Sequence, residues 1–229
     1  MKTNLVLAFS SFHVDSDPNY EREEEYALCY EQLLRVLPEN FTVLFCDNTV
    51  SDVSELKNER LKNVLKSNLK MFYNNNVGTT NKGLGELDML VTAMKKITFS
   101  SYETVSYLTG RRIITCPYVF DKMTNLKKDA IMSNPPIYSI NTGNEYPSGE
   151  KLYNDMFFGM KSSLMIEYAK FVETLICKPT HLGSEQFLYK FVNEVGVDFE
   201  WIESLGFIRN DWQQTSSEYT REQGNAQWI

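Results

Sequence analysis

Residues 4–12, NLVLAFSSF, form an apolar run that ends in small polar residues, and this pattern predicts a buried first strand. The segment 20–37, YEREEEYALCYEQLLRVL, follows after a loop that contains Pro18, and its apolar spacing predicts an amphipathic helix. A strand followed by a helix is the unit from which parallel sheets are built. The start of the chain therefore favours an α/β fold.

The alternation of strands and helices continues along the first half of the chain. The patterns predict a strand at 41–49, a charged helical stretch near 53–67, a strand at 69–75, a helix at about 85–97 and a strand at 104–115 that ends or bulges at Gly110. We see no internal repeat in the sequence. Strands in this arrangement predict a mostly parallel central sheet flanked by helices.

The second half of the chain is more irregular. Residues 117–155 are rich in Pro, Asn, Gly and Ser and predict an excursion that shapes a pocket, with one or two short strands that include PPIYSIN at 135–141. A strand running into a helix at 155–176, a helix at 184–195 and a last strand or hairpin at 199–211 follow. We expect one domain over residues 1–210 and a loose polar tail over 211–229.

Composition and charge exclude several classes of protein. The 229 residues are 42% hydrophobic and carry a formal net charge of −7 without a long basic run, which disfavours a nucleic-acid partner. No apolar stretch approaches the roughly 18 to 20 residues that cross a bilayer, and the first residues are too polar for a secretory signal. We expect a soluble cytoplasmic protein without a membrane span.

The cysteines and histidines do not form a pattern typical of a metal site or a catalytic triad. The four cysteines at positions 29, 46, 116 and 177 include no CxxC pair, so reduced and mostly buried thiols are expected. His13 and His181 lie far apart in the sequence. A histidine-rich metal site and a Ser-His-Asp triad are therefore disfavoured.

Polar residues follow the predicted strands at the point where each strand ends. In open α/β sheets, ligands bind at the carboxyl ends of the strands, so these residues form one candidate surface. They are Ser10 and Ser11, Asp47 and Asn48, residues 74–76, and residues 109–112.

This surface suits a nucleoside diphosphate. Asp47 can hydrogen-bond a ribose or a base, and Lys82 stands with two glycines at a helix start, where the helix dipole favours an anion. Arg111 and Arg112 add forked donors suited to phosphate oxygens. A purely structural role is also possible for each of these residues. A glutamate such as Glu86 is favourable in the first turn of an ordinary helix, and paired arginines are often solvated. Aspartate, as at position 47, is common in turns.

Two familiar nucleotide motifs are incomplete. The segment GLGELD, residues 83–88, lacks the third glycine of a dinucleotide fingerprint, and the chain contains no GxxxxGK[ST] sequence. A Rossmann dehydrogenase and a P-loop enzyme are therefore disfavoured.

Four segments in order resemble the small GT-A-type glycosyltransferases of bacterial and viral surface-polysaccharide pathways. They are TNKGLGELDML (80–90), YLTGRRIIT (107–115), DMFFGMKSSLMIEYAKFV (155–172) and SEQFLYKFV (184–192). Members of that group show an N-K-G-[IV]-G-E helix start and a K-[IL]-[ST]-G-R-Y segment, and here Arg112 stands where tyrosine is usual. The resemblance covers residues 4–195.

The resemblance implies a GT-A-like (Rossmann-like) fold and an enzyme that moves a sugar from a nucleotide-diphosphate sugar, such as a UDP- or GDP-sugar, to a hydroxyl of a glycan acceptor. Residues 1–115 would bind the donor and residues 116–210 the acceptor. Catalytic domains of this group are often fused to, or act with, other domains of glycan synthesis. The donor-site residues that the resemblance implies are Ser10, Ser11, Asp47, Lys82, Gly83, Gly85, Glu86, Thr109, Gly110, Arg111 and Arg112, and Arg22 matches an arginine of the first helix.

Glycosyl transfer needs a carboxylate to take the acceptor proton if the reaction inverts the sugar's anomeric centre. The segment SEQF resembles the acidic helix start that supplies this group, so Glu185 is the first candidate and Asp155 the second. An ordinary N-terminal helix charge is the alternative for Glu185. Tyr146, Tyr153, Phe157 and Phe158 either stack on sugar rings or belong to the core.

One departure from the family concerns the metal. GT-A enzymes usually hold Mn²⁺ or Mg²⁺ with a D-x-D segment at the end of the central strand, where this chain has TGRR at 109–112. Glu86 and Asp88, two apart on a helix, point in different directions. We hypothesise that Lys82, Arg111 and Arg112 neutralise the departing diphosphate instead of a metal, with Mn²⁺ or Mg²⁺ as the alternative.

Two other functions stay open. A nucleotidyltransferase would bind a nucleotide at the same strand ends, but it normally needs a glycine-rich signature and acidic metal ligands near the first strand, where only Asp15 and Asp17 stand. A non-catalytic module that binds nucleotide sugars or carbohydrates is the third possibility.

Overall fold

A computed structural model describes residues 3–75, 77, 82–133, 144–145, 151–153, 155–176, 183–202 and 207–209. The first half of this chain alternates strands and helices, as expected. Its elements are β1 (Thr3–Ser10), α1 (Glu21–Val36), β2 (Phe41–Asp47), the 3-10 helix η1 (Val53–Glu55), α2 (Glu59–Lys66), β3 (Leu69–Phe72), α4 (Lys82–Lys96), the 3-10 helix η2 (Phe99–Ser101) and β4 (Tyr102–Thr109).

The second half adds strands to both sides of this framework. Its elements are β5 (Arg112–Ile114), α5 (Tyr118–Thr124), β6 (Ala130–Ser133), β7 (Asn144–Glu145), β8 (Lys151–Leu152), β9 (Phe157–Lys161), α6 (Ser162–Ile176), α7 (Ser184–Val195), β10 (Phe199–Ile202) and β11 (Phe207–Arg209). No helix among the described residues is long and apolar enough to cross a membrane.

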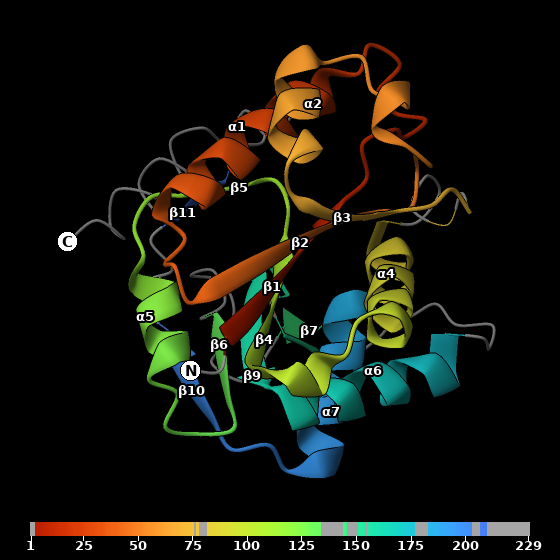
Figure 1. Ribbon diagram of the computed structural model, residues 1–229. Helices are drawn as coiled ribbons and strands as arrows, with labels where there is room; N and C mark the ends of the chain where they lie inside the picture. The colour runs from red at the N-terminus through yellow and green to blue at the C-terminus, as the bar shows by residue number, and fades with distance from the viewer. Residues whose placement is uncertain are drawn as a thin grey trace.

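A seven-stranded sheet in the order β10-β6-β9-β4-β1-β2-β3 runs through the centre of the protein (Figure 1). β3, β2, β1 and β4 lie parallel to one another, β9 runs antiparallel between β4 and β6, and β10 is parallel to β6. The prediction of an α/β domain with a mostly parallel central sheet is confirmed.

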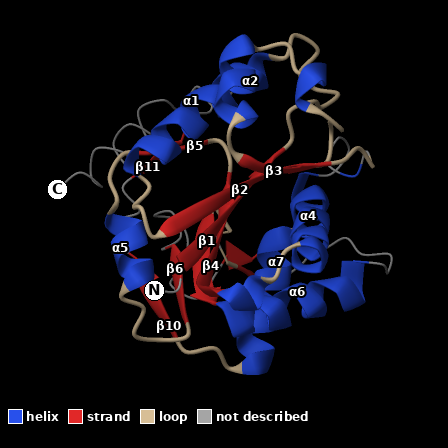
Figure 2. Ribbon diagram, in the orientation of Figure 1, coloured by secondary structure: helices blue, strands red, loops and turns tan. Residues whose placement is uncertain are grey.

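Helices cover both faces of this sheet. Figure 2 shows α1, α2 and α5 on one side of the strands and α4, α6 and α7 on the other. Successive residues of a strand point to opposite faces, so β1 divides its apolar side chains between two cores. Leu5, Leu7 and Phe9 pack in the core beneath α4, α6 and α7, whereas Val6 and Ala8 pack in the core beneath α1 and α5.

The predicted end of the strand at Gly110 is confirmed: β4 ends at Thr109, and the residues after the break form β5, which pairs with β11 in a separate two-stranded sheet. Two other predictions differ from the structure. β10 and β11 are consequently not a hairpin, because β10 joins the central sheet instead. The irregular stretch 117–155 contains the helix α5, which its mixed composition concealed, and PPIYSIN lies outside the described residues.

Two further boundaries moved. The charged stretch at 53–67 is divided into η1 and α2, because Asn58 caps α2 by accepting a 2.9 Å hydrogen bond from the Leu61 amide. α4 begins at Lys82, three residues before the predicted start, so the lysine belongs to the first turn of the helix.

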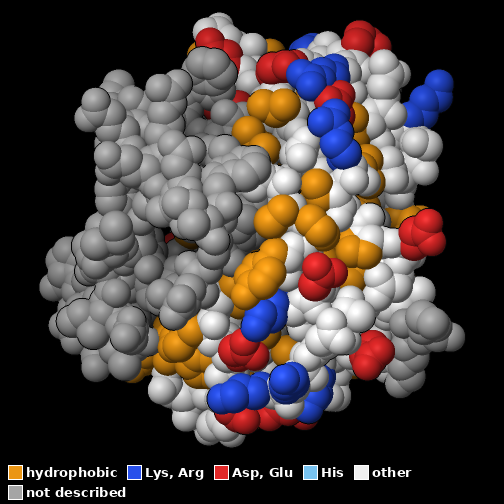
Figure 3. All heavy atoms as spheres, turned by 90° about the vertical axis from the view of Figure 1, so that its left-hand side faces the viewer, with side chains coloured by type: hydrophobic (Ala, Val, Ile, Leu, Met, Phe, Trp, Pro, Cys, Tyr) orange, Lys and Arg blue, Asp and Glu red, His pale blue; other side chains and the backbone are white. Residues whose placement is uncertain are grey.

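Figure 3 shows the face of the protein on which α1 and α5 lie in Figure 1. Hydrophobic side chains form a band along this face, and lysines and arginines alternate with acidic side chains at its two ends (Figure 3). Charges of opposite sign therefore lie side by side on the part of this face that the structure describes.

Candidate active site

The carboxyl ends of the four parallel strands meet at one edge of the sheet, as the sequence predicted. Ser10 at the end of β1 lies opposite Asp47 at the end of β2, and Phe9 lies opposite Thr109 on β4. Asp47 in turn pairs with Phe72 at the end of β3. Residues from three predicted segments thus share one edge.

Asp47 uses both carboxylate oxygens to hold the adjacent loops. Oδ2 accepts a 2.9 Å hydrogen bond from the Phe12 amide, and Oδ1 accepts bonds from the amides of Thr49 and Val50 and from the Thr49 hydroxyl. The side chain is fully buried, which raises its pKa, while the bonds from Thr49 and Phe12 oppose that rise. In this geometry the Asp47 carboxylate holds the loop after β1 and the loop after β2 in place, and its contact with a nucleoside stays a prediction.

Ser10 and Ser11 are also buried, and their contacts fix the end of β1 against neighbouring elements. The Ser10 hydroxyl donates a 2.8 Å bond to the Cys46 carbonyl, and the Ser11 amide donates a 3.0 Å bond to the Tyr26 hydroxyl. Arg22 on α1 donates from Nε to the Ser11 carbonyl at 3.0 Å. The arginine that the family resemblance marked on the first helix therefore lies at this edge.

Gly110 lets the chain turn sharply after β4. Its amide donates a 2.7 Å bond to the Phe9 carbonyl, and a Cβ at this position would lie 2.4 Å from that oxygen and 2.7 Å from Tyr26 Cε1. The close approach leaves room only for glycine. Arg111 follows, and its Nη1 lies 3.0 Å from Oε2 of the buried Glu25 on α1.

At the start of α4, a half-exposed lysine in the first turn forms an ion pair with a buried carboxylate one turn further along the helix. Lys82 Nζ lies 2.8 Å from Glu86 Oε1, and the Glu86 side chain is 2% exposed. Oε2 of the same carboxylate accepts a 2.8 Å bond from the Tyr107 hydroxyl on β4. The Gly85 carbonyl on α4 accepts a 3.2 Å bond from the side chain of Asn48, which directly follows β2.

Asp155 and Glu185 lie on the same side of the sheet as this ion pair. Ser184, the first residue of α7, donates from its hydroxyl to Asp155 Oδ2 and lies 3.4 Å from Glu185 Oε2. Burial raises the pKa of Asp155 to about 8, with further contributions from the negative charges of Glu185 and Glu86, while Ser184 and Lys82 oppose the rise. The three carboxyl groups therefore interact electrostatically around one lysine.

The structure divides the predicted residues into two groups. Arg22 and Arg111 lie beside α1 on one side of the sheet, whereas Lys82, Glu86, Asp155 and Glu185 lie with α4 and α7 on the other side (Figure 1). We call the second group, together with Tyr107 and Ser184, the carboxyl cluster. Thr109 is the last residue of β4, which lies between β1 and β9 in the sheet, and Gly110 follows it directly.

Three residues of this site, Tyr107, Ser184 and Glu25, were not predicted from the sequence. Tyr107 occupies an inward position in the alternating strand, where a tyrosine needs a partner for its hydroxyl. Ser184 appeared to be an ordinary residue of a helix start, and Glu25 was one of a run of acids at 23–25. Helical spacing predicts a buried position within that run, and this pattern could have identified Glu25.

The aromatic candidates that the structure describes belong to the core. Tyr153, Phe157 and Phe158 are 5%, 0% and 0% exposed, so the core interpretation holds for them. Tyr146 lies outside the described residues, as do His181 and Cys177. Cys29 and Cys46 are buried free thiols.

The donor set of the described residues does not form a cation site. No group of three or more His, Cys, Asp and Glu side chains among them has the arrangement that holds a metal ion. Glu86 pairs with Lys82 and Tyr107, whereas Asp88 accepts bonds from Tyr73 and Asn75. The two acids of α4 thus point in different directions, as predicted.

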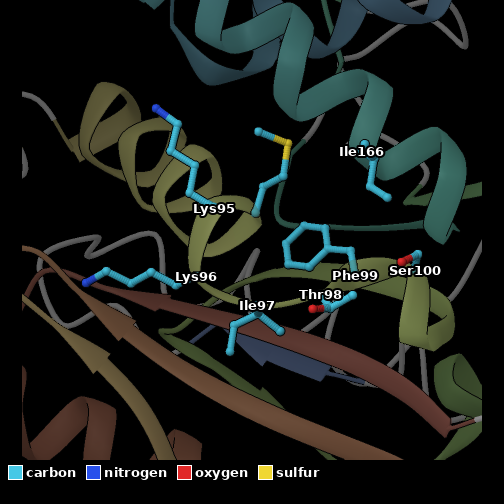
Figure 4. A pocket seen from close by; sticks show the side chains of 8 residues that line it. Lys95, Lys96, Ile97, Thr98, Phe99, Ser100 and Ile166 are labelled. Atoms are coloured by element: carbon cyan, nitrogen blue, oxygen red, sulfur yellow. The ribbon is translucent and has the colours of Figure 1, made fainter.

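A hollow of about 280 Å³ lies at the opposite end of α4, where Figure 4 shows the side chains around it. Its lining comes from Met94, Lys95, Lys96, Ile97, Thr98, Phe99, Ser100 and Ile166. These residues precede β4 or lie on α6, away from the carboxyl ends of the parallel strands. Its ionisable groups are two lysines, so it lacks the carboxylates that group transfer requires.

Many solved structures share the fold of this chain, and two of them are informative. One is described as a nucleotide-diphospho-sugar transferase from Desulfovibrio desulfuricans G20; it is 13% identical, the TM-score is 0.51, and the match covers 88% of this chain and 80% of the other. The other is a 4-diphosphocytidyl-2C-methyl-D-erythritol synthase from Anaerococcus prevotii DSM 20548, also 13% identical, with a TM-score of 0.56 and coverage of 100% and 97%.

The chain has the fold of nucleotide-diphospho-sugar transferases. The same fold serves the synthase from Anaerococcus prevotii, a nucleotidyltransferase. Neither a protein-family model nor a curated protein matches the sequence. At 13% identity these similarities establish the architecture, and the function must be argued from the site.

Proposed function

We propose that this protein is a glycosyltransferase that moves a sugar from a nucleotide-diphosphate sugar to a hydroxyl of a glycan acceptor. The observation that carries the proposal is the carboxyl cluster beside the carboxyl edge of the parallel sheet. It combines a lysine in the first turn of a helix with two carboxyl groups, Asp155 and Glu185, from separate segments. A cation for a diphosphate and a base for a hydroxyl are the two groups that the reaction needs.

Lys82 is the proposed contact to the donor diphosphate. Its side chain is 38% exposed even though its ammonium pairs with Glu86, so a ligand at the surface can reach this lysine. Tyr107 holds the Glu86 carboxylate through its second oxygen, and this bond fixes the position of the lysine. A held cation stabilises the negative charge that develops on the leaving diphosphate without further reorganisation.

Glu185 is the proposed base, because it is less buried than Asp155 and lies in the first turn of α7. An ionised carboxylate is favoured at a helix N-terminus. Asp155 is the second candidate, but burial and neighbouring charge raise its pKa to about 8, so it is largely protonated at neutral pH.

Arg111 is the second proposed source of positive charge for the diphosphate. Its ion pair with the buried Glu25 holds the guanidinium close to the end of β4, and a guanidinium is a permanently charged group suited to phosphate oxygens. Together with Lys82 and Arg112, it supports transfer without a metal held by a D-x-D segment.

Nucleotidyl transfer is the second candidate function, favoured by the shared fold with the synthase from Anaerococcus prevotii. A screen of UDP-, GDP-, CMP- and TDP-sugars by thermal shift, followed by assays of donor hydrolysis, separates the candidates. Stabilisation with slow hydrolysis supports glycosyl transfer, a response only to nucleoside triphosphates supports nucleotidyl transfer, and stabilisation without turnover supports a binding module. Loss of hydrolysis in chelator with recovery in Mn²⁺ would contradict the metal-independent mechanism.

A further inference from the structure

The hydroxyl of Ser184 lies between two carboxyl groups. Its Oγ is within hydrogen-bonding distance of Asp155 Oδ2 and lies 3.4 Å from Glu185 Oε2, and it is placed to donate to either carboxyl group. Ser184 is 3% exposed and Asp155 8% exposed, so water has little access to this arrangement.

A serine hydroxyl carries one hydrogen and two lone pairs. It can donate to only one of the two carboxyl groups at a time. The second carboxyl group completes a bond to Oγ only if it carries a proton and donates it. The arrangement is therefore fully hydrogen-bonded when Asp155 and Glu185 hold one proton between them.

The surroundings of Asp155 also favour one retained proton. Groups from four elements face it: Glu185 on α7, Glu86 and Lys82 on α4, Tyr107 on β4 and Tyr168 on α6. Burial raises the pKa of both tyrosines, which therefore stay neutral. Among the residues that the structure describes, three carboxyl groups thus share the charge of Lys82, and full ionisation would place excess negative charge in a buried site.

We propose that Asp155, Ser184 and Glu185 hold one shared proton at neutral pH and that the Ser184 hydroxyl passes it between the two carboxyl groups. In each transfer, one carboxyl O–H bond breaks as its proton moves to Ser184 Oγ. The original serine hydrogen moves to the other carboxylate at the same time. The number of protons and the total charge of the unit stay constant.

The two ends of this unit differ in exposure. Asp155 is the buried end, and Glu185 is the partly exposed end. When the shared proton resides on Asp155, Glu185 is ionised and can act as a base. Ser184 touches no substrate in this arrangement and is a positioning residue.

The catalytic consequence rests on the proposed glycosyl transfer, whereas the shared proton does not. In that reaction the acceptor O–H bond breaks and its proton goes to Glu185, while the acceptor oxygen bonds to the anomeric carbon. The bond from that carbon to the phosphate oxygen breaks, and its electron pair leaves with the diphosphate. The unit then holds two protons and releases one to water before the next turnover.

Carboxyl ¹³C NMR on the full chain, labelled at Asp and Glu and titrated with pH, tests the proposal without any assay of activity. We expect one of the two carboxyl groups to be protonated at pH 7 in the unaltered protein. We also expect the Asp155 and Glu185 resonances to move together in one step. In Ser184→Ala the Glu185 resonance should no longer follow the step of Asp155, and Ser184→Thr, which keeps a hydroxyl, should restore it.

Ionisation of both carboxyl groups at pH 7 in the unaltered protein would overturn the proposal, and so would a shared step that persists in Ser184→Ala. Asp155→Asn identifies the Asp155 resonance and should leave Glu185 with an independent titration. If the shared step is present but no sugar is transferred, only the proposed function fails. If transfer occurs, Ser184→Ala should lower kcat at pH 7 by about tenfold or more and alter its pH profile, with donor affinity unchanged.

Discussion

The hydroxyl of Tyr107 donates a 2.8 Å hydrogen bond to Oε2 of Glu86, and both side chains are buried between the sheet and α4. Glu86 Oε1 faces Lys82 at 2.8 Å, so one carboxylate connects the central strand to the proposed donor cation. The tyrosine ring stacks on Phe158 of β9 with a centroid separation of 4.6 Å. The buried hydrogen bond between Tyr107 and Glu86 thus helps to position Lys82, whose side chain reaches the surface.

Removal of this hydroxyl should destabilise the protein. Tyr107→Phe keeps the stacked ring but leaves one oxygen of a buried carboxylate without its donor, which should cost about 1–3 kcal/mol in the free energy of unfolding. Urea denaturation measures the change. Tyr102→Phe, on the half-exposed first residue of the same strand, is the control and should cost much less. Equal effects of the two substitutions would show that the bond to Glu86 contributes nothing.

Gly110→Ala should destabilise the protein through steric overlap. The new methyl group would lie 2.4 Å from the Phe9 carbonyl oxygen, 2.7 Å from Tyr26 Cε1 and 2.9 Å from the Tyr30 hydroxyl. Displacement of a central strand should cost about 1–3 kcal/mol or more. Gly196→Ala is the comparison: its φ of 72° strains alanine by about 1 kcal/mol, yet no atom lies within 4 Å. A smaller effect at Gly110 than at Gly196 in thermal melts would refute the packing argument.

Lys82→Ala should weaken donor binding by about 10- to 100-fold, because it removes a charged donor to the diphosphate. Isothermal titration with the nucleotide sugar selected by the thermal-shift screen measures the affinity. Lys95→Ala is the matched control, since Lys95 lies at the other end of α4 and pairs with Glu173. If Lys82→Ala binds the nucleotide sugar with unchanged affinity, the start of α4 has only a structural role.

Glu185→Gln should lower the rate of sugar transfer by a factor of about 10² to 10⁴ and leave donor affinity intact, because glutamine cannot accept the acceptor proton. Single-turnover assays at saturating donor measure the rate. Glu194→Gln, an exposed position on the same helix, is the control. If Glu185→Gln retains turnover, Glu185 is not the base, and Asp155 becomes the candidate for that role.

Asp155 should make the stability of the protein depend on pH. The fold raises its pKa from 3.8 to about 8, so the folded state holds the proton more tightly than the unfolded state does. The carboxyl group therefore lowers stability progressively as pH rises from about 4 to about 8. Asp155→Asn lacks this dependence.

The melting temperature of Asp155→Asn minus that of the unaltered protein should accordingly increase over this pH range and become constant above it. Thermal melts at unit intervals of pH measure the difference. A difference that stays constant across the range would mean that the pKa of Asp155 is not raised.

The order of strands and helices was readable from the sequence because it depends on local patterns. The apolar run of 4–12 and the amphipathic spacing of 20–37 each act within a single element, and both elements formed where expected. The common edge of the strand ends follows from parallel pairing alone, so the proximity of Ser10, Asp47 and Thr109 was also predictable.

The roles of individual side chains at that edge could not be predicted from local sequence patterns. Asp47 has the residue type and position of a ligand contact, but both its oxygens serve neighbouring loops. Arg111 pairs with Glu25, which lies 86 positions away in the sequence. Such pairings depend on how α1 packs against the sheet, and no local pattern encodes that packing.

The sequence by itself therefore determined the α/β class, the order of the elements and the edge at which polar residues gather, because hydrophobic periodicity and strand ends are local properties. The tertiary structure alone decided that β9 inserts antiparallel between β4 and β6 and that α7 packs against α4. Those arrangements bring Asp155 and Glu185 into electrostatic contact with Glu86 and Lys82. Their physical basis is burial of apolar faces between elements distant in sequence, which sets the distances between charges only after the chain has folded.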